Sequence, residues 1–244
     1  MAGSGVTSTK RSGDYFCGSC PGALLSASTR KCPFDLVYAV EIDPQKGNAL
    51  KNRLGTLLSQ QNVIVFNRDI ADVSQEIAQE LQHKTISYIV IDPQAFQGMT
   101  WAGIGPLLRC KGDVMITWFE PECWRIKCAS IAQNEHQAAE ASGKRLTELF
   151  GREQWKNAQS PEELTKLFIE RVVGECGKTA YAKIKIPRSD GNYYWMILFT
   201  KAAKLADEWK KHVEKRINSA HGQDIAVLLD VKAGRTSTLK NWIE

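Results

Sequence analysis

The chain has 244 residues, of which 43% are hydrophobic and 24% charged, close to the usage of ordinary globular domains. No apolar run approaches the roughly 18 residues that a transmembrane helix needs, so we expect no membrane-spanning segment. The net charge of +5 and the pI near 8.8 permit an anionic partner such as nucleic acid without demonstrating one.

The first 13 residues are small, polar and basic, and they predict a flexible leader. The basic pair Lys10-Arg11 is not followed by the apolar segment of a secretory signal. We therefore expect a cytoplasmic protein whose seven cysteines are mostly thiols. The length suits one α/β domain, which we place at 14–219, followed by a tail at 220–244.

From residue 14 onward, short apolar runs alternate with amphipathic stretches. Continuous apolar runs are typical of parallel strands buried on both faces, and four of them occur, at 36–40, 63–66, 87–91 and 113–119. Stretches with one apolar stripe predict helices at 45–59 and 70–82, and a weaker helix at 102–110 that Gly105-Pro106 interrupts. This alternation predicts crossover units and a doubly wound, mostly parallel sheet.

The last third of the chain predicts a β-hairpin. Residues 180–186 alternate with period two, residues 193–199 follow, and the intervening Asp190-Gly191 pair is a strong turn signal. A parallel sheet that ends in an antiparallel hairpin is the arrangement of class I S-adenosylmethionine (SAM) methyltransferases. By this analogy the predicted fold is α/β and Rossmann-like, with the class I methyltransferase topology.

A long helical insertion, 120–179, precedes the hairpin. Its pattern predicts one helix over 130–150 and a second that begins with Ser160 as N-cap, Pro161 in the first turn and Glu163 three residues after the cap. Such an insertion would lie over the carboxyl edge of the sheet, where ligands bind in these folds. A last helix, 202–218, carries lysines that either face solvent or follow phosphates.

Several residues are candidates for holding a nucleoside cofactor. In Asp14-Tyr-Phe-Cys-Gly18 the carboxylate could bind an ammonium group and the glycine could admit a ligand, although a surface turn explains both. Glu41, after the first run, could accept ribose hydroxyl groups or be an ordinary loop carboxylate. Asp69, after the second run, could receive the adenine amino group and could also cap the helix that follows, and the two roles are compatible.

Asp92, Pro93 and Phe96 follow the third run and are the candidates for the methyl acceptor site. Amino-methyltransferases carry an Asp-Pro-Pro-aromatic tetrad at this position, which binds the target amine and stacks on its ring. Here Gln94 stands third and the aromatic residue comes one place late. The alternative is a simple turn in which Pro93 ends the strand.

The cysteines include one C-x2-C pair, Cys17 and Cys20, with Cys32 further on. A zinc site usually needs two such pairs, so ordinary thiols are favoured and no metal is predicted. Among the tryptophans, those beside apolar runs are predicted to be core: Trp101, Trp118 and Trp195. The two in the insertion are better candidates for a substrate surface: Trp124 and Trp155.

Three stretches together resemble the three-Cys-motif partner proteins. They are Asp14–Gly18 with the following Gly22-Ala-Leu-Leu-Ser-Ala27, Asp92-Pro93 with Trp101, and Leu146-Thr-Glu-Leu-Phe-Gly151 with Trp155 and the Tyr193-Tyr194 strand. The similarity spans roughly residues 14–215. It implies a class I methyltransferase-like fold, SAM as cofactor, and a radical-SAM-like partner protein bearing a three-cysteine motif.

Three hypotheses of function remain open. The first is a SAM-dependent methyltransferase-like enzyme acting on nucleic acid or a nucleotide-derived substrate. The second is a non-catalytic subunit that keeps the fold as a protein- or nucleic-acid-binding scaffold, which the poor strand formers 10–13 and the altered tetrad favour. The third is a metal-bearing protein that uses Cys17, Cys20 and Cys32.

Overall fold

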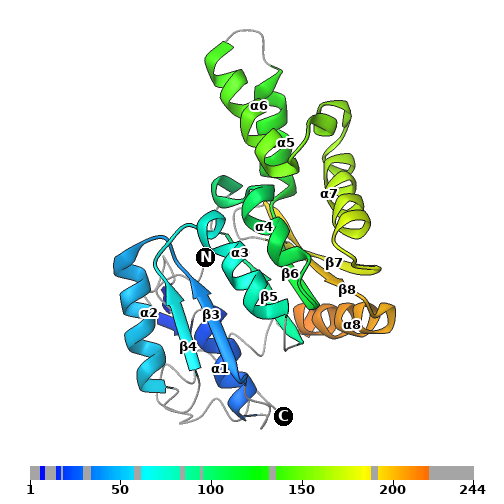
Figure 1. The fold of residues 1–244 in the computed structure, drawn as a ribbon. Coiled ribbons are helices and arrows are strands. Elements are labelled where there is room, and N and C mark those ends of the chain that lie inside the picture. Colours follow the sequence, from blue (N-terminus) through cyan, green and yellow to red (C-terminus); the bar gives the residue numbers. More distant parts are fainter. Residues whose placement is uncertain are drawn as a thin grey trace.

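The computed structural model describes residues 6–8, 15–17, 19–29, 34–57, 62–82, 86–93, 96–131, 136–187 and 192–219. Its strands are β1 Val6–Ser8, β2 Tyr15–Cys17, β3 Leu36–Val40, β4 Asn62–Phe66, β5 Ser87–Ile91, β6 Gly112–Trp118, β7 Ala180–Pro187 and β8 Tyr193–Thr200. Its α-helices are α1 Ser19–Thr29, α2 Pro44–Leu57, α3 Ile70–Gln82, α4 Trp101–Leu108, α5 Glu120–Ser130, α6 His136–Phe150, α7 Pro161–Glu175 and α8 Ala203–Ser219. Two 3-10 helices are η1 Phe96–Gly98 and η2 Glu153–Asn157 (Figure 1).

The strands of this α/β fold form three sheets. β3 and β4 are parallel, with Val40 opposite Phe66. A mixed sheet has the order β5-β6-β8-β7, in which β5 and β6 are parallel and β8 is antiparallel to both of its neighbours. The third sheet is the antiparallel pair β1-β2. The predicted strand–helix alternation and terminal hairpin are therefore confirmed.

The expectation of one continuous sheet is wrong for the described residues. β2 is the strand that would join the two larger sheets, but it pairs with β1, with Thr7 opposite Phe16. β2 has only three residues and follows the poor strand formers 10–13, so it is short and has no flanking residues that favour a longer strand. β1 lies within the segment 1–13 that was predicted as a leader. The boundaries of the domain at 14–219 remain a prediction.

The largest hydrophobic cluster packs on one face of the four-stranded sheet. Trp118 of β6 is fully buried at its centre and stacks on Phe168 of α7, with ring centroids 4.3 Å apart. Phe96 and Phe150 meet the same indole edge-on, at 5.5 and 6.2 Å. The indole Nε1 of Trp118 donates a hydrogen bond of 2.9 Å to Thr165 Oγ1, so the one polar atom of this side chain is satisfied.

Two smaller clusters cover the faces of the β3–β4 sheet. On one face, Leu24 of α1 and Leu50 and Leu54 of α2 pack against Ala39. On the other face the buried residues are Val73 and Ile77 of α3 and Leu107 of α4. Partly buried residues from two different sheets pack against this last trio: Tyr38 and Val40 of β3, Phe66 of β4 and Ile89 of β5. The α3–α4 pair therefore bridges the two sheets.

The helical insertion is built from α5, α6, η2 and α7 rather than from the two predicted helices. Figure 1 shows α5 and α6 together beyond one end of the four-stranded sheet, whereas α7 packs on the sheet through Phe168, which contacts Trp118 and Phe199. The predicted start of the last of these helices is confirmed, because Ser160 Oγ accepts a hydrogen bond from Glu163 N. The predicted single helix over 130–150 is wrong at its beginning, since α5 ends at Ser130 and α6 begins at His136.

Two further predictions need correction. Helix α4 continues through Pro106, because most of its residues are buried and its N-cap, Thr100, accepts a hydrogen bond from Gly103 N. Trp155 is not on the surface: it is buried, and its Nε1 donates to Thr147 Oγ1 at 3.1 Å. Trp101 and Trp118 are buried as predicted. None of the helices in the described ranges is both long and apolar enough to cross a bilayer.

The large cluster should dominate stability, and two leucines test this. Leu164 of α7 is fully buried in that cluster, whereas Leu205 of α8 is 40% exposed. We expect Leu164→Ala to lower the free energy of unfolding by about 2–5 kcal/mol, because it removes buried methyl groups and leaves a cavity. Leu205→Ala is the control and should change it by less than about 1 kcal/mol. Urea denaturation measures both, and similar values for the two variants would contradict this packing.

Candidate functional site

Glu41 is a buried carboxylate immediately after β3. Its side chain is only 3% exposed. Its main-chain N–H donates to Phe66 O at 2.9 Å, which ties it to the end of β4. Its Oε1 accepts a hydrogen bond from Asp43 N at 3.1 Å. The backbone thus holds an acidic side chain in one orientation at the carboxyl edge of the β3–β4 pair.

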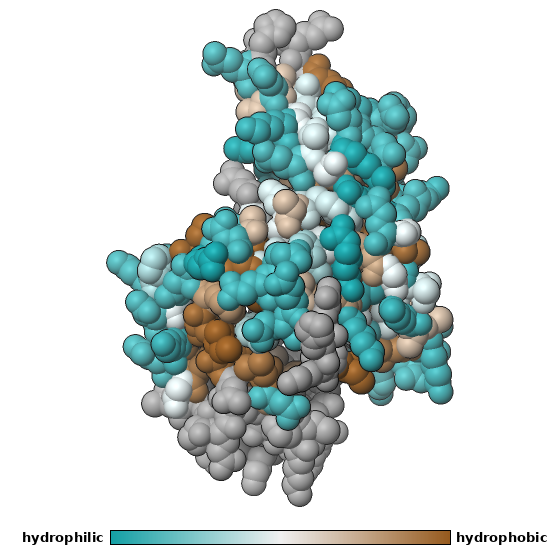
Figure 2. All heavy atoms as spheres, viewed as in Figure 1, coloured by the Kyte–Doolittle hydropathy of each residue, from teal (hydrophilic) through white to brown (hydrophobic). Residues whose placement is uncertain are grey.

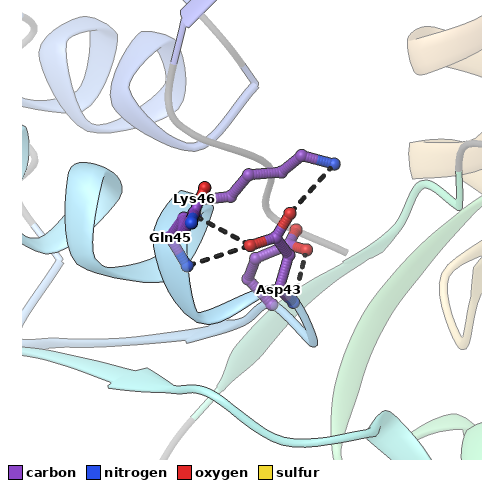
Figure 3. A network of polar contacts seen from close by, with 4 residues as sticks. Asp43, Gln45 and Lys46 are labelled. Carbon is purple, nitrogen blue, oxygen red and sulfur yellow. Dashed lines mark hydrogen bonds and ion pairs between the residues drawn. The ribbon is translucent and has the colours of Figure 1, made fainter.

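Asp43 closes the turn that leads from Glu41 into α2. Its Oδ1 accepts hydrogen bonds from Gln45 N at 2.9 Å and Lys46 N at 3.3 Å (Figure 3). The hydrogen bond from Lys46 N has the largest effect and lowers the pKa of Asp43; desolvation opposes it, and the hydrogen bond from Gln45 N adds to the lowering. A side chain at Gly47 would overlap Asn67, so glycine lets α2 approach the end of β4.

Asp69 caps α3, which was one of its two predicted roles. Its Oδ1 accepts a hydrogen bond of 2.8 Å from Ala71 N. Glu41 and Asp69 follow the ends of adjacent, in-register parallel strands, so the structure brings them to the same sheet edge. The other two cofactor candidates, Asp14 and Gly18, lie outside the described residues.

The acceptor-site candidates are placed at the end of β5. Asp92 Oδ1 accepts a hydrogen bond of 2.7 Å from Thr117 Oγ1 of β6, and the adjacent Pro93 is buried. Phe96, in contrast, is 3% exposed and packs against the Trp118 indole. Its ring belongs to the core and lines a cavity of about 20 Å³, room for about one water molecule.

A second buried carboxylate, Glu120, lies just beyond the end of β6 and was missed by the sequence analysis. Glu120 Oε2 accepts a 2.5 Å hydrogen bond from Thr165 Oγ1, and Oε1 accepts a 2.6 Å hydrogen bond from Tyr193 OH. Thr165 in turn accepts the Trp118 Nε1 hydrogen bond. The signal that could have found Glu120 is its position, because it follows an apolar run as Glu41 and Asp92 do.

The four carboxylates, Glu41, Asp69, Asp92 and Glu120, therefore follow, in sequence order, the strands of two parallel pairs, β3–β4 and β5–β6. β5 and β6 are in register, so Asp92 and Glu120 lie toward one edge of their sheet, as Glu41 and Asp69 do on theirs. β8 starts at this same edge because it is antiparallel to β6. Hydroxyl donors and carboxylate acceptors in this arrangement can bind neutral hydroxyl or amino groups of a ligand.

The cysteines whose side chains the structure describes are Cys20, Cys110, Cys123, Cys128 and Cys176, all as free thiols. Burial raises the pKa of Cys20 and raises that of Cys123 well above the ordinary value, which disfavours the reactive thiolate. Within the described ranges no three histidine, cysteine or acidic side chains are grouped as a metal site would require. Cys32 lies outside those ranges.

No protein-family model and no curated protein matches the chain. Solved structures with distant similarity include the following three. A candidate exported protein from Bordetella parapertussis has 12% identity and a TM-score of 0.36, over 70% of this chain and 55% of that one. The O-methyltransferase TomG from Streptomyces achromogenes, involved in tomaymycin synthesis and solved with SAM, has 10% identity and a TM-score of 0.40, over 75% and 81%.

The third structure is a candidate O-methyltransferase from Klebsiella pneumoniae, with 7% identity and a TM-score of 0.39 over 82% of this chain and 85% of that one. This chain thus spans about half of the Bordetella protein and more than four fifths of the two others. All three TM-scores are below 0.5, so these similarities are too distant to establish a shared activity.

The Tyr193–Glu120 hydrogen bond predicts a pH dependence. Desolvation, and then the hydrogen bond to Glu120 and its negative charge, raise the pKa of Tyr193 from 10 to about 12. The unfolded chain releases this proton near pH 10 and the folded chain near 12, so the stabilisation is complete below pH 10 and is lost as pH rises toward 12.

Tyr193→Phe should lower the free energy of unfolding by about 1–3 kcal/mol at pH 8, because it removes a hydrogen bond to a carboxylate. Urea titrations of both proteins at pH 8 and pH 11 measure this difference, which should shrink at pH 11. Tyr181→Phe, at an exposed position of β7, is the control. A difference that is the same at both pH values would contradict the raised pKa.

Proposed function

We propose that this chain is a SAM-dependent methyltransferase-like protein that acts on nucleic acid or a nucleotide-derived substrate. The observation that carries the proposal is Glu41, a carboxylate that is almost fully buried and fixed by the backbone at the end of β3. Ligands of open α/β sheets bind outside the carboxyl ends of the strands, where an acidic side chain accepts the ribose hydroxyl groups.

The described residues fit such a nucleoside in their chemistry. Glu41 is already oriented, so little conformational entropy would be lost when it binds a ribose. Asp69 follows the adjacent strand, at the N-terminus of α3, where an adenine amino group could be received. The cofactor would supply the methyl group, and the role of the chain would be to bind and align donor and acceptor.

On the acceptor side, we assign Asp92 rather than Phe96 to the substrate. Asp92 is held by Thr117 at the end of β5, and a carboxylate in this position can accept a hydrogen bond from a hydroxyl or amino group. The Phe96 ring is occupied by its contact with Trp118 and is unsuited to stacking on a substrate without rearrangement of the core. The net charge of +5 suits an anionic substrate.

The second candidate function is a non-catalytic subunit with a methyltransferase-like fold. Two observations favour it: Phe96 lies in the core, and β2 pairs outside the two larger sheets. In this case the surface of the protein would bind a protein or nucleic acid partner, for which a three-Cys-motif radical-SAM-like protein is our proposal.

Titration calorimetry with SAM, and separately with its demethylated product, distinguishes the two candidates. For the enzyme we expect micromolar binding of both ligands, weakened at least about tenfold by Glu41→Gln because the ribose loses a charged acceptor. Glu170→Gln, at an exposed position of α7, is the matched control and should bind normally. Because Glu41 is buried, circular dichroism must show that the variant is folded. Absence of heat for both ligands would favour the non-catalytic subunit.

A further inference from the structure

Two parallel strands, β3 and β5, each have one edge without a strand partner among the described residues. β3 pairs with β4 and β5 pairs with β6, and neither pairs with a second strand within those ranges. Backbone N–H and C=O groups on such an edge remain available for another strand. Two such edges in one fold are unusual, because the strands of a doubly wound sheet normally run on without interruption.

The two edges are covered by one hydrophobic cluster. Tyr38 of β3 and Ile89 of β5 both pack against the cluster formed by Val73 and Ile77 of α3 and Leu107 of α4. The helix pair α3–α4 therefore covers β3 and β5 on a common face, as crossover helices cover neighbouring strands of one sheet. This arrangement makes the region between β3 and β5 a candidate position for a further strand.

The exposure of β5 is high for a parallel strand. Parallel strands are normally buried on both faces, and β5 is an almost continuous apolar run. Ile89 is half-buried against α3, yet Tyr88 and Val90, on the opposite face, are 48% and 40% exposed. Apolar residues of β3 and β4 are exposed as well, Leu36 and Ile64, and Figure 2 shows hydrophobic side chains gathered over these strands.

We propose that β2 exchanges between its hairpin with β1 and a position between β3 and β5. The hairpin has only three residue pairs, and an isolated two-stranded hairpin of this kind is marginal in water. In the inserted position β2 would gain two parallel neighbours. The sheet order would become β4-β3-β2-β5-β6-β8-β7, and one continuous sheet would replace the two larger ones.

The connection from β2 through α1 to β3 suits this exchange. A strand–helix–strand unit places its two strands in parallel with the helix on one face of the sheet. Helix α1 already packs on a face of the β3–β4 sheet, through Leu24 against Leu50 and Leu54. That face is opposite α3, and Tyr88 and Val90 are opposite α3 too, so α1 beside an inserted β2 would help to cover them.

The exchange is independent of the proposed function, because it concerns strand pairing and needs no cofactor. It has a consequence for the site, however. The carboxyl end of an inserted β2 would lie at the sheet edge between Glu41 and Asp92, and would make one site of two separated ones. The hairpin form would then be the open state, and the continuous sheet the state able to bind a ligand across both edges.

Hydrogen–deuterium exchange of the full chain tests the proposal through two proline variants. Thr7→Pro weakens β1, the competitor, whereas Phe16→Pro disables β2 in both positions. We expect Thr7→Pro to slow amide exchange in 36–40 and 87–91 by about threefold or more, because strand edges become paired more of the time. Phe16→Pro should not slow it, and the internal strand 112–118 is the reference. Unchanged or faster exchange at both edges in Thr7→Pro would overturn the proposal.

Disulfide trapping supplies a second measurement on the unperturbed hairpin. Adjacent strands lie about 4.8 Å apart, within the range that a disulfide spans. Val90→Cys and Ile91→Cys introduce one thiol on each face of the carboxyl end of β5, the end that would lie beside Cys17 of an inserted β2, and mild oxidation should join one of them to the natural Cys17. Tyr181→Cys, exposed on β7, is the control and should not form this bond. Peptide mapping that finds no link from Cys17 to position 90 or 91 would also overturn the proposal.

Discussion

The pairing of parallel strands is the constraint on which the rest of this molecule depends. Val40 opposite Phe66, and Ile91 opposite Ile116, fix where each strand ends and therefore where the acidic residues after them lie. Buried backbone groups must find hydrogen-bond partners, so a strand cannot slip without losing several of them. A one-residue slip in β5 would also turn Ile89 and Ile91 away from the core. The register of the strand pairs therefore fixes the positions of the residues in the candidate site.

The carboxylates at the carboxyl edges of the two larger sheets have different kinds of hydrogen-bond partner. At Glu41 and Asp69, main-chain N–H groups hold the carboxylates, so that the turn itself orients them. At Glu120 the partners are side chains, Thr165 and Tyr193, and the network is anchored to the Trp118 core. Such a buried network is rigid because every lost hydrogen bond leaves a desolvated charge. The first edge is therefore the better place for a ligand to exchange hydrogen bonds, whereas the second joins α5 and α7 to the sheet.

Local patterns predicted elements well and their assembly less well. Apolar runs predicted β3 to β6, the Asp190-Gly191 pair predicted the hairpin of β7 and β8, and Ser160 as N-cap predicted the start of α7. Burial decided the cases that local signals missed: α4 continues through Pro106, and Trp155 finds Thr147 as a buried partner. For the candidate site, the sequence predicted only the acidic residues that follow the strands. Whether Phe96 faces a ligand or the core depends on packing from distant segments, which no local pattern records.

In our proposal, a small difference in free energy decides whether β2 pairs with β1 or lies between β3 and β5. A hairpin of three residue pairs and a short parallel ladder differ little in free energy, so single substitutions can change which of the two arrangements is more populated. A ligand that contacted both Glu41 and Asp92 would bind the continuous sheet better than the divided one, and would shift the population by its difference in affinity. The weak pairing of β2 would then be a means of coupling ligand binding to assembly of the sheet.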